Sequence, residues 1–279
     1  SMGSDSNFVE ACDVGSIDLG ATSGNRVGGS LEQRNRVNSI VINGTGDGNS
    51  ILGNYIGCDL AGEISAGSSQ SGVGIRNGAT NTVISGNLIS GSGFAGIEVS
   101  DSTTQNITIS GNWIGTNSAG TGPLGNAASG VRVYNDVAGL IISDNIISGN
   151  NGEAGIFAFD ISDVIISGNY IGCAPDASAI GNLADGIWLT GTSFDNIIGG
   201  PNGGNTIANN GGSGISLLVL TGNGNSILGN SIFNNVNQGI GNLTHVSVST
   251  PNLNSAIINL AVDSVTVSGS YTNSDIGIQ

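Results

Sequence analysis

The sequence Asn49-Ser-Ile-Leu-Gly-Asn54 returns as Asn225-Ser-Ile-Leu-Gly-Asn230, and related copies lie between the two. The asparagines that end the first five copies are separated by 33, 25, 33 and 24 residues, so long and short units alternate. A tandem repeat of this length indicates a protein that stacks one structural unit on copies of itself. The intermediate copies are Thr82-Val-Ile-Ser-Gly-Asn87, Thr108-Ile-Ser-Gly-Asn112, Ile141-Ile-Ser-Asp-Asn145 and Ile165-Ile-Ser-Gly-Asn169.

Each unit contains three short apolar segments and shows no helical periodicity. In one unit these are Gly155-Ile-Phe-Ala-Phe159, Asp163-Val-Ile-Ile-Ser167 and Asn169-Tyr-Ile-Gly172. β-Branched residues bounded by Gly, Asn and Ser indicate short strands separated by turns. Three strands in about 24 residues, stacked on near-copies, predict a parallel β-solenoid. The additional residues of the long units follow the third strand, as in Gly120–Asn126, and are expected to loop outward.

The composition agrees with a β protein and limits its partners. Of the 279 residues, 49 are glycine, which disfavours helices, while a hydrophobic fraction of 38% provides side chains for a core. Twenty acidic residues against five arginines and no lysine give a net charge of −15. Such a surface repels nucleic acids and anionic membrane surfaces. No apolar run is long enough to predict insertion into a membrane.

The extent of the repeat predicts three parts of the chain. Residues 1–24 are expected to hold a tag remnant, Ser1-Met-Gly-Ser4, and an N-terminal cap. Residues 25–240 carry the β-helix repeats. Residues 241–279, where the repeat has decayed but strand-like alternation continues, predict a C-terminal β cap or the start of a further β domain.

The repeated units resemble a known group of proteins. The chain is similar, from about Asn25 to Ile240, to right-handed parallel β-helix proteins of the pectate lyase-like superfamily, and in particular to bacterial secreted and surface proteins with tandem N-x-I-x-G-N-x-I-G units. The resemblance implies an all-β fold, a single-stranded right-handed parallel β-helix with three parallel sheets and eight or nine turns. It also implies an extracellular location, secreted or at the cell surface. Activity is not implied, because this fold carries lyases, hydrolases, epimerases, tailspikes and adhesins.

The recurring asparagines are expected to form a ladder inside one turn of the stack. At the strand spacing of about 4.8 Å, their amides can hydrogen-bond to one another and to the turn backbone. Such bonds satisfy polar groups that would otherwise be costly to bury. The ladder is expected to comprise Asn54, Asn87, Asn112, Asn145, Asn169 and Asn230.

Strand alternation assigns the faces of the first strand of each unit. The residue after the glycine should point inward, the next residue outward, and the residue two positions further on outward again. The expected inward column is Ile97, Val131, Ile156, Ile187 and Ile215, and the outward columns are Glu98, Arg132, Phe157, Trp188 and Ser216, and Arg76, Ser100, Tyr134, Phe159 and Thr190, with Asp101, Asp136, Asp160 and Asp163 beside them.

The outward aromatic residues are the feature that suggests a function. Trp188 and Phe157 are expected to be substantially exposed, and rings flanked by carboxylates and arginine suit sugar rings. In the family that the chain resembles, this first sheet is the floor of the substrate groove, and the loops after Tyr55, Trp113 and Tyr170 would wall it. Loops, a neighbouring domain or another subunit could instead cover the rings. The candidate ligand-binding residues are Arg76, Glu98, Asp101, Arg132, Tyr134, Phe157, Phe159, Asp160 and Trp188.

Two functions therefore stay open: a carbohydrate-binding or adhesive module, whose partner is a polysaccharide or cell-surface glycan, and a polysaccharide lyase or glycoside hydrolase acting in the same groove. The first is preferred, because neither the calcium-binding carboxylates of pectate lyases nor the aspartate trio of polygalacturonases is matched. Only one histidine, His245, is present, which argues against a histidine-dependent triad. For catalysis the candidates are Glu98, Arg132, Asp136 and Asp160.

No cofactor is expected, and calcium is the one ion that the acidic loops leave open. Asp59 with Glu63, and Asp176 with Asp185, are oxygen donors in turns, although no dense calcium-loop pattern surrounds them. The cysteines Cys12, Cys58 and Cys173 make no metal motif. Cys58 and Cys173 occupy equivalent loops four units apart, about 19 Å at strand spacing, which is too far for a disulfide.

Overall fold

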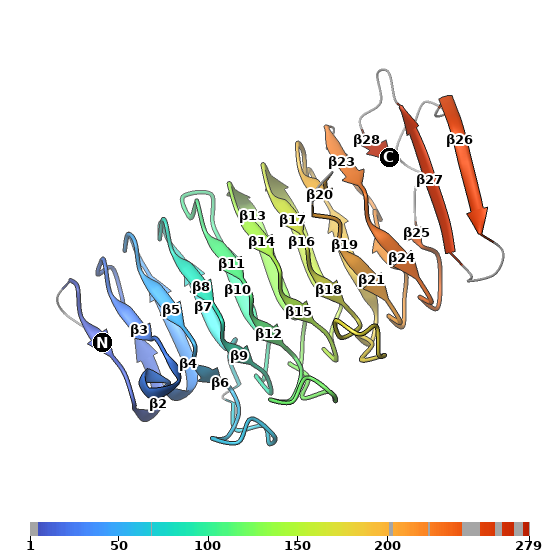
Figure 1. Ribbon diagram of the computed structural model, residues 1–279. Helices are drawn as coiled ribbons and strands as arrows, with labels where there is room; N and C mark the ends of the chain where they lie inside the picture. The colour runs from blue at the N-terminus through green and yellow to red at the C-terminus, as the bar shows by residue number, and fades with distance from the viewer. Residues whose placement is uncertain are drawn as a thin grey trace.

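The protein is an elongated stack of short parallel strands that begins near the N-terminus, with an antiparallel pair of strands at its C-terminal end (Figure 1). The structure is a computed structural model and describes residues 5–67, 69–200, 203–222, 224–241, 252–259, 264–270 and 276–278. One turn of the chain, called a rung here, passes through three sheets. The predicted parallel β-helix with three sheets is confirmed.

The first sheet contains the strand that follows the recurrent glycine of each unit. Its strands pair in parallel, and the edge strand β2 (Asp13–Asp18) pairs with β4. The others are β4 (Arg36–Asn43), β7 (Val73–Arg76), β10 (Ile97–Ser100), β13 (Val131–Ala138), β16 (Ala154–Ser162), β19 (Asp185–Thr190), β22 (Ile215–Ser216) and β25 (Ile240–Gly241).

The second sheet contains the strand that precedes the ladder asparagine of each unit. Its strands are β1 (Phe8–Val9), β3 (Arg26–Gly28), β5 (Ser50–Leu52), β8 (Val83–Ser85), β11 (Thr108–Ser110), β14 (Ile141–Ser143), β17 (Ile165–Ser167), β20 (Ile197–Gly199), β23 (Asn225–Leu228) and β28 (Ile276–Ile278).

The third sheet contains the two- and three-residue strands after that asparagine. Near the N-terminus it is continuous with the first sheet, because Arg36 and Val37 of β4 pair with β6 while Ile40–Asn43 pair with β7. A short 3-10 helix, η1 (Leu31–Gln33), leads into β4. The strands are β6 (Tyr55–Ile56), β9 (Leu88–Ile89), β12 (Trp113–Ile114), β15 (Ile146–Ile147), β18 (Tyr170–Ile171), β21 (Thr206–Ala208) and β24 (Ser231–Phe233).

Isoleucine and valine side chains fill the space between the three sheets. The inward column predicted for the first sheet pairs in register through successive strands, and each of its members is fully buried. The second and third sheets add equivalent columns, so one continuous core runs along the stack. The columns are Ile97, Val131, Ile156, Ile187 and Ile215, then Ile51, Ile84, Ile109 and Ile142, and Ile56, Ile89, Ile114 and Ile147.

The asparagine ladder is present in the turn between the second and third sheets. The backbone N–H and the side-chain Nδ2 of Asn87 both donate to Oδ1 of Asn112, at 3.0 and 2.9 Å, and Asn112 donates in the same way to Asn145. Nδ2 of Asn112 also donates to the carbonyl of Ile84. The prediction is confirmed, and the ladder has two further members: it comprises Asn35, Asn54, Asn87, Asn112, Asn145, Asn169, Asn205 and Asn230.

A second ladder, which the sequence analysis missed, lies in the turn between the third sheet and the first. As in the first ladder, the backbone N–H and Nδ2 of each asparagine donate to Oδ1 of the next asparagine. Each bond from Nδ2 to Oδ1 is 2.9 Å long. An asparagine that follows Gly125, Gly149 or Gly181 is the signal that could have revealed it. The members are Asn126, Asn150, Asn182, Asn210 and Asn235.

The extra residues of the long units form closed loops after the strands of the third sheet. Short antiparallel bridges close these loops at Cys58–Ser65, Thr116–Pro123 and Cys173–Ala179. The backbone of Gly120 lies so close to Trp113 that an added Cβ would be 2.9 Å from its ring. This loop therefore packs against the indole of Trp113, which is still 37% exposed.

The two ends of the stack differ in their pairing. At the N-terminus, β1 and β2 pair in parallel with β3 and β4, so residues before Asn25 already extend the sheets. Near the C-terminus, β26 (Asn252–Asn259) and β27 (Ser264–Ser270) form an antiparallel pair, and β28 pairs with β23. His245 lies outside the described residues. Among the residues that are described, no helix is long and apolar enough to cross a membrane.

Candidate functional site

The outer face of the first sheet carries the columns that the sequence analysis predicted. Through β10, β13, β16, β19 and β22, Glu98 pairs with Arg132, Arg132 with Phe157, Phe157 with Trp188, and Trp188 with Ser216. The neighbouring column contains Ser100, Tyr134, Phe159 and Thr190 in the same register. The strand register therefore aligns these residues in the predicted columns, although Ser100, Thr190 and Ser216 are buried.

Arg132 is the centre of this face. Its Nη1 lies 2.7 Å from Oε1 of Glu153, and its guanidinium stands over the rings of Phe157, Tyr134 and Phe94, at 4.6, 5.4 and 5.5 Å from their centroids. We call these five residues, together with Trp188, the Arg132 cluster. Arg132 is thus held by one carboxylate and three rings, which fixes the rings on the outer surface.

Trp188 and Phe157 are less exposed than the sequence analysis expects. Both are only partly exposed, because the two rings pack edge to face with centroids 5.2 Å apart and planes at 87°. Strand pairing places their backbones in adjacent rungs, so the side chains cover one another. The rings with more free surface are Phe159, 38% exposed, and Phe94, 37% exposed.

Glu98 is held by two neighbours, one on each carboxylate oxygen. The hydroxyl of Ser71 donates to Oε2 at 2.6 Å, and the hydroxyl of Tyr134 donates to Oε1 at 2.5 Å. Burial, followed by the hydrogen bond to Glu98 and its negative charge, raises the pKa of Tyr134, so this phenol stays protonated as a donor. Glu98 is consequently a fixed hydrogen-bond acceptor on the floor of the face.

The aspartates beside the columns have a left-handed backbone, Asp136 and Asp160 within strands and Asp101 and Asp163 outside them. Asp101, Asp136, Asp160 and Asp163 have φ values of 82, 60, 51 and 54°, a conformation that aspartate tolerates better than most residues. Asp101 accepts a bond from the backbone N–H of Asn77 and Asp160 from that of Thr192. Asp136 lies in a bulge of β13, where the pairing with β16 shifts after Tyr134. Asp101 and Asp160 therefore stabilise turns of neighbouring rungs.

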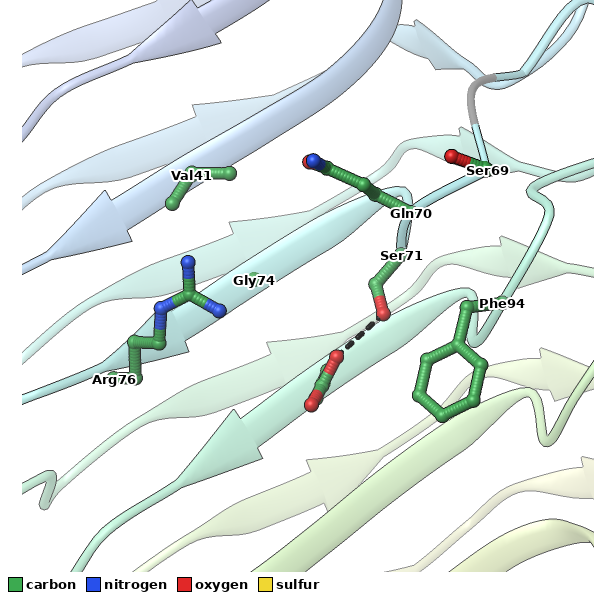
Figure 2. Close-up of a pocket in the computed structure, with 8 residues that line it drawn as sticks. Val41, Ser69, Gln70, Ser71, Gly74, Arg76 and Phe94 are labelled. Atoms are coloured by element: carbon green, nitrogen blue, oxygen red, sulfur yellow. Dashed lines mark hydrogen bonds between the residues drawn. The ribbon is translucent and has the colours of Figure 1, made fainter.

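A pocket of about 250 Å³ lies at the N-terminal end of this face (Figure 2). Its wall comes partly from the end of the first long loop, at Gln70 and Ser71. Sequence reasoning missed the contributions of Phe94 and Glu153, because the pattern of a single strand does not show which loop residues lie over it. It also missed Gly74 of β7, which brings no side chain to the column. The pocket is lined by Gln70, Ser71, Gly74, Arg76, Phe94 and Glu98.

The ion pair of Glu153 makes stability depend on pH. Burial alone would raise the pKa of Glu153, but hydrogen bonds from its own backbone N–H and from Ser129, with the charge and hydrogen bond of Arg132, outweigh burial and hold it below the usual value. A depressed folded-state pKa stabilises the fold above the unfolded-state pKa, and this contribution is lost as pH falls through the folded-state pKa.

Glu153→Gln is therefore expected to lower the urea midpoint of unfolding at pH 7, and this deficit should shrink progressively between pH 7 and pH 3. Urea titrations followed by circular dichroism at the two pH values measure this difference. Glu32→Gln, the same substitution at an exposed glutamate of η1, should match the wild type at both. A deficit of Glu153→Gln that is equally large in acid would show that the charge of Glu153 is not what stabilises the fold.

The described residues do not gather a metal site. They contain no group of three or more His, Cys, Asp and Glu side chains placed to hold an ion. Cys58 and Cys173 are buried free thiols, and burial first of all raises their pKa to about 12 and about 11. In the acidic loops, Asp59 accepts bonds from the backbone N–H groups of Glu63 and Ile64.

Together, the stacked parallel sheets, the inward isoleucine columns and the ladders define a right-handed parallel β-helix protein. A profile of the family described as periplasmic copper-binding protein (NosD) matches residues 123–259, just under half of the chain. The described part of the matched segment offers no cluster of copper ligands. No curated protein sequence matches the chain significantly.

Solved structures share this fold at low sequence identity. The chain is similar to the A-module of the Azotobacter vinelandii mannuronan C-5 epimerase AlgE4, with 15% identity, a TM-score of 0.50, and coverage of 81% of this chain and 62% of that one. It is also similar to the enzymatically active domain of bacteriophage CBA120 tailspike protein 2, with 16% identity, a TM-score of 0.51, and coverage of 85% and 37%. The periplasmic alginate epimerase AlgG follows at 14% and 0.48, with 81% and 59% covered. The chain therefore spans about three fifths of the epimerases. These likenesses show the fold alone.

Proposed function

We propose that the chain is a secreted or cell-surface β-helix module that binds a carbohydrate polymer along its first sheet. The observation that carries the proposal is the Arg132 cluster. Aromatic rings and hydrogen-bonding side chains alternate there on an outward face that the described residues leave partly open. Rings of this kind rarely remain on a surface without a partner.

The arrangement suits a sugar polymer for two physical reasons. Flat apolar rings can stack on the faces of sugar rings, while the Glu98 carboxylate and the Tyr134 hydroxyl can exchange hydrogen bonds with sugar hydroxyls. The side chains also repeat at the strand spacing of about 4.8 Å along a straight axis, which suits a linear chain better than a compact ligand. Among proteins of similar fold is one named for mannuronan, which supports the proposal only by likeness of fold.

Binding is favoured over cleavage because three of the four candidate catalytic groups are already engaged. Both oxygens of Glu98 accept hydrogen bonds, Arg132 is paired with Glu153, and Asp160 holds the backbone of Thr192. A polysaccharide lyase or glycoside hydrolase needs a group that is free to move a proton or attack the sugar. Of the four candidates, Asp136 is the exposed carboxylate in a bulge beside the face.

Affinity electrophoresis through gels that contain single polysaccharides tests the proposal. One or more polymers should retard the wild type, and Phe159→Ala should weaken that binding at least tenfold with little change in the unfolding temperature, because its ring is well exposed. Trp188→Ala should also abolish binding, but it should lower the unfolding temperature as well, since the indole packs on Phe157.

Phe8→Ala is the matched control. Its ring is 65% exposed in β1, at the end of the second sheet, so removal should leave retardation unchanged. Assays for new reducing ends and for unsaturated products, run on the same polymers, test the enzymatic alternative. Retardation by none of the polymers, or equal retardation of Phe159→Ala, Trp188→Ala and wild type, would contradict a glycan-binding first sheet.

A further inference from the structure

The pocket beside Arg132 exists because one position of the groove column is glycine. In register, Val41 pairs with Gly74 and Gly74 with Glu98, so Gly74 stands where later rungs carry Glu98, Arg132, Phe157 and Trp188. The missing side chain leaves a gap between the side chains of Val41 and Glu98, and both of them line the pocket. Figure 2 shows this gap, with Gly74 on the floor between Val41 and Ser71.

Packing does not require glycine at this position. A Cβ added at Gly74 would have one neighbour within 4 Å, the Cγ2 of Val41 at 3.9 Å, and the backbone has no positive φ. Two residues earlier, a Cβ on Gly72 would come within 2.9 Å of the Gly96 carbonyl and of Ile89. Close packing of the rungs therefore requires glycine at position 72 but not at position 74. Glycine at position 74 is also unfavourable for a β-strand. What Gly74 provides is the pocket.

Arg76 is the cation of the pocket. Three other arginines form ion pairs, with Glu10, Asp13 and Glu153, and Arg34 stacks on Tyr55 with its guanidinium 4.0 Å from the ring centroid. The exposed guanidinium of Arg76 has neither an ion pair nor a hydrogen bond to any residue that the structure describes. In a chain with five cations and a net charge of −15, an unpaired arginine beside a cavity indicates an anionic group on the ligand.

Glu98 provides a negatively charged hydrogen-bond acceptor in the same pocket. Ser71 and Tyr134 fix its carboxylate, and no salt bridge within 4.0 Å joins it to Arg76. A carboxylate has about four acceptor sites, so oxygens that accept one bond each can still receive sugar hydroxyls. The exposed ring of Phe94 stands beside them and can contact the apolar face of a sugar. A sugar ring that carries hydroxyls and one negative group could contact Arg76, Glu98 and Phe94 together.

The overall charge limits how many negative groups the ligand can carry. At −15, the protein repels a polymer that is charged at every residue, and this repulsion extends over a Debye length of about 10 Å at 0.1 M salt. A single anionic group that reaches Arg76 gains a direct contact while the rest of the polymer adds no repulsion. The charge balance therefore favours sparse anionic substituents on a neutral glycan.

We infer that the Gly74 pocket binds one sugar residue bearing a single carboxylate, sulfate or phosphate within an otherwise neutral glycan. This inference rests on the proposed function, because the pocket lies at one end of the same face. Arg76 holds the anionic group, Glu98 accepts hydroxyl hydrogens, and Gly74 is the specificity-determining residue, since a larger side chain there would occupy the space of the sugar.

Saturation-transfer NMR with small probes tests the pocket separately from the polymer site. The probes are glucose, glucuronate, a sulfated glucose, a phosphorylated glucose and inorganic sulfate. We expect at least one anionic sugar to bind at least tenfold more tightly than glucose, and the ranking of the three identifies the anionic group. Gly74→Val and Arg76→Gln should each weaken that binding at least tenfold, while Arg76→Lys should restore part of it.

Gly15→Val is the matched control, because Gly15 lies in strand β2 and an added Cβ there would have no neighbour within 4 Å. It should bind like the wild type. Failure of every anionic sugar to exceed glucose, or unchanged binding by both pocket variants, would overturn the inference even if polymers still bind at Phe159 and Trp188. Equal binding of inorganic sulfate and sulfated glucose would mean an adventitious ion only, and would also overturn it.

Discussion

Asn112→Leu is expected to lower the free energy of unfolding by about 3 kcal/mol. Leucine has a similar size but neither donates nor accepts, so the buried N–H of Asn87 loses its acceptor and the carbonyl of Ile84 loses a donor. Both groups lie inside the stack, where water cannot replace the lost partner. The penalty should exceed that of a typical surface substitution because several bonds of one ladder are lost together.

Urea unfolding followed by circular dichroism measures this effect. Asn151→Leu is the matched control, because Asn151 is an exposed asparagine outside both ladders, and its substitution should change stability by less than about 0.5 kcal/mol. If the two variants unfolded at the same urea concentration, the ladder would contribute nothing beyond the packing of its side chains.

Gly130→Ala is expected to cost about 3 kcal/mol, although it adds a single methyl group. That methyl would lie 2.6 Å from Cγ2 of Ile147, 2.8 Å from Nδ2 of Asn150 and 2.9 Å from the carbonyl of Gly155. The three neighbours are a core side chain, a ladder amide and the next rung, and none of them can move without disturbing its own contacts. The rungs would have to separate locally.

Gly74→Ala provides the comparison, since its methyl group meets Val41 alone at 3.9 Å. We expect it to be neutral or to stabilise the fold by about 0.5 kcal/mol, because alanine restricts the unfolded chain more than glycine does. Thermal and urea unfolding of the two variants should therefore move in opposite directions or differ severalfold. A similar loss in both would mean that strand glycine matters for conformation and not for the approach of neighbouring rungs.

The fold could be predicted because the repeat samples the same environment many times. The register of Ile97, Val131 and Ile156 follows from alternation alone, since every copy places a β-branched residue after glycine. Asn35 and Asn205 were missed because several residues separate each of them from the preceding apolar strand, which ends at Gly28 and Gly199, although their amides occupy the same ladder. A repeated position is therefore easier to identify from the sequence when its flanking residues repeat as well.

For the candidate site, only the residues that lie in strands could be predicted from the sequence. Alternation placed Glu98, Arg132 and Trp188 on one outward face, and the structure agrees. Alternation could not show that Glu153 pairs with Arg132, because Glu153 lies in a turn. Nor could it show how far Trp188 is covered, since that depends on the rotamers of adjacent rings and not on which face they share.

The spacing of the ladder has a consequence for how such a protein can change in length. From Asn54 to Asn230, each ladder bond joins residues that are 24 to 36 positions apart, however far they lie from either terminus. Each rung thus depends on its immediate neighbours alone. Duplicating or excising one long and one short unit together would preserve every kind of interface in the stack. Such events would lengthen or shorten the outward face by whole rungs, so this face can be extended without redesigning the core.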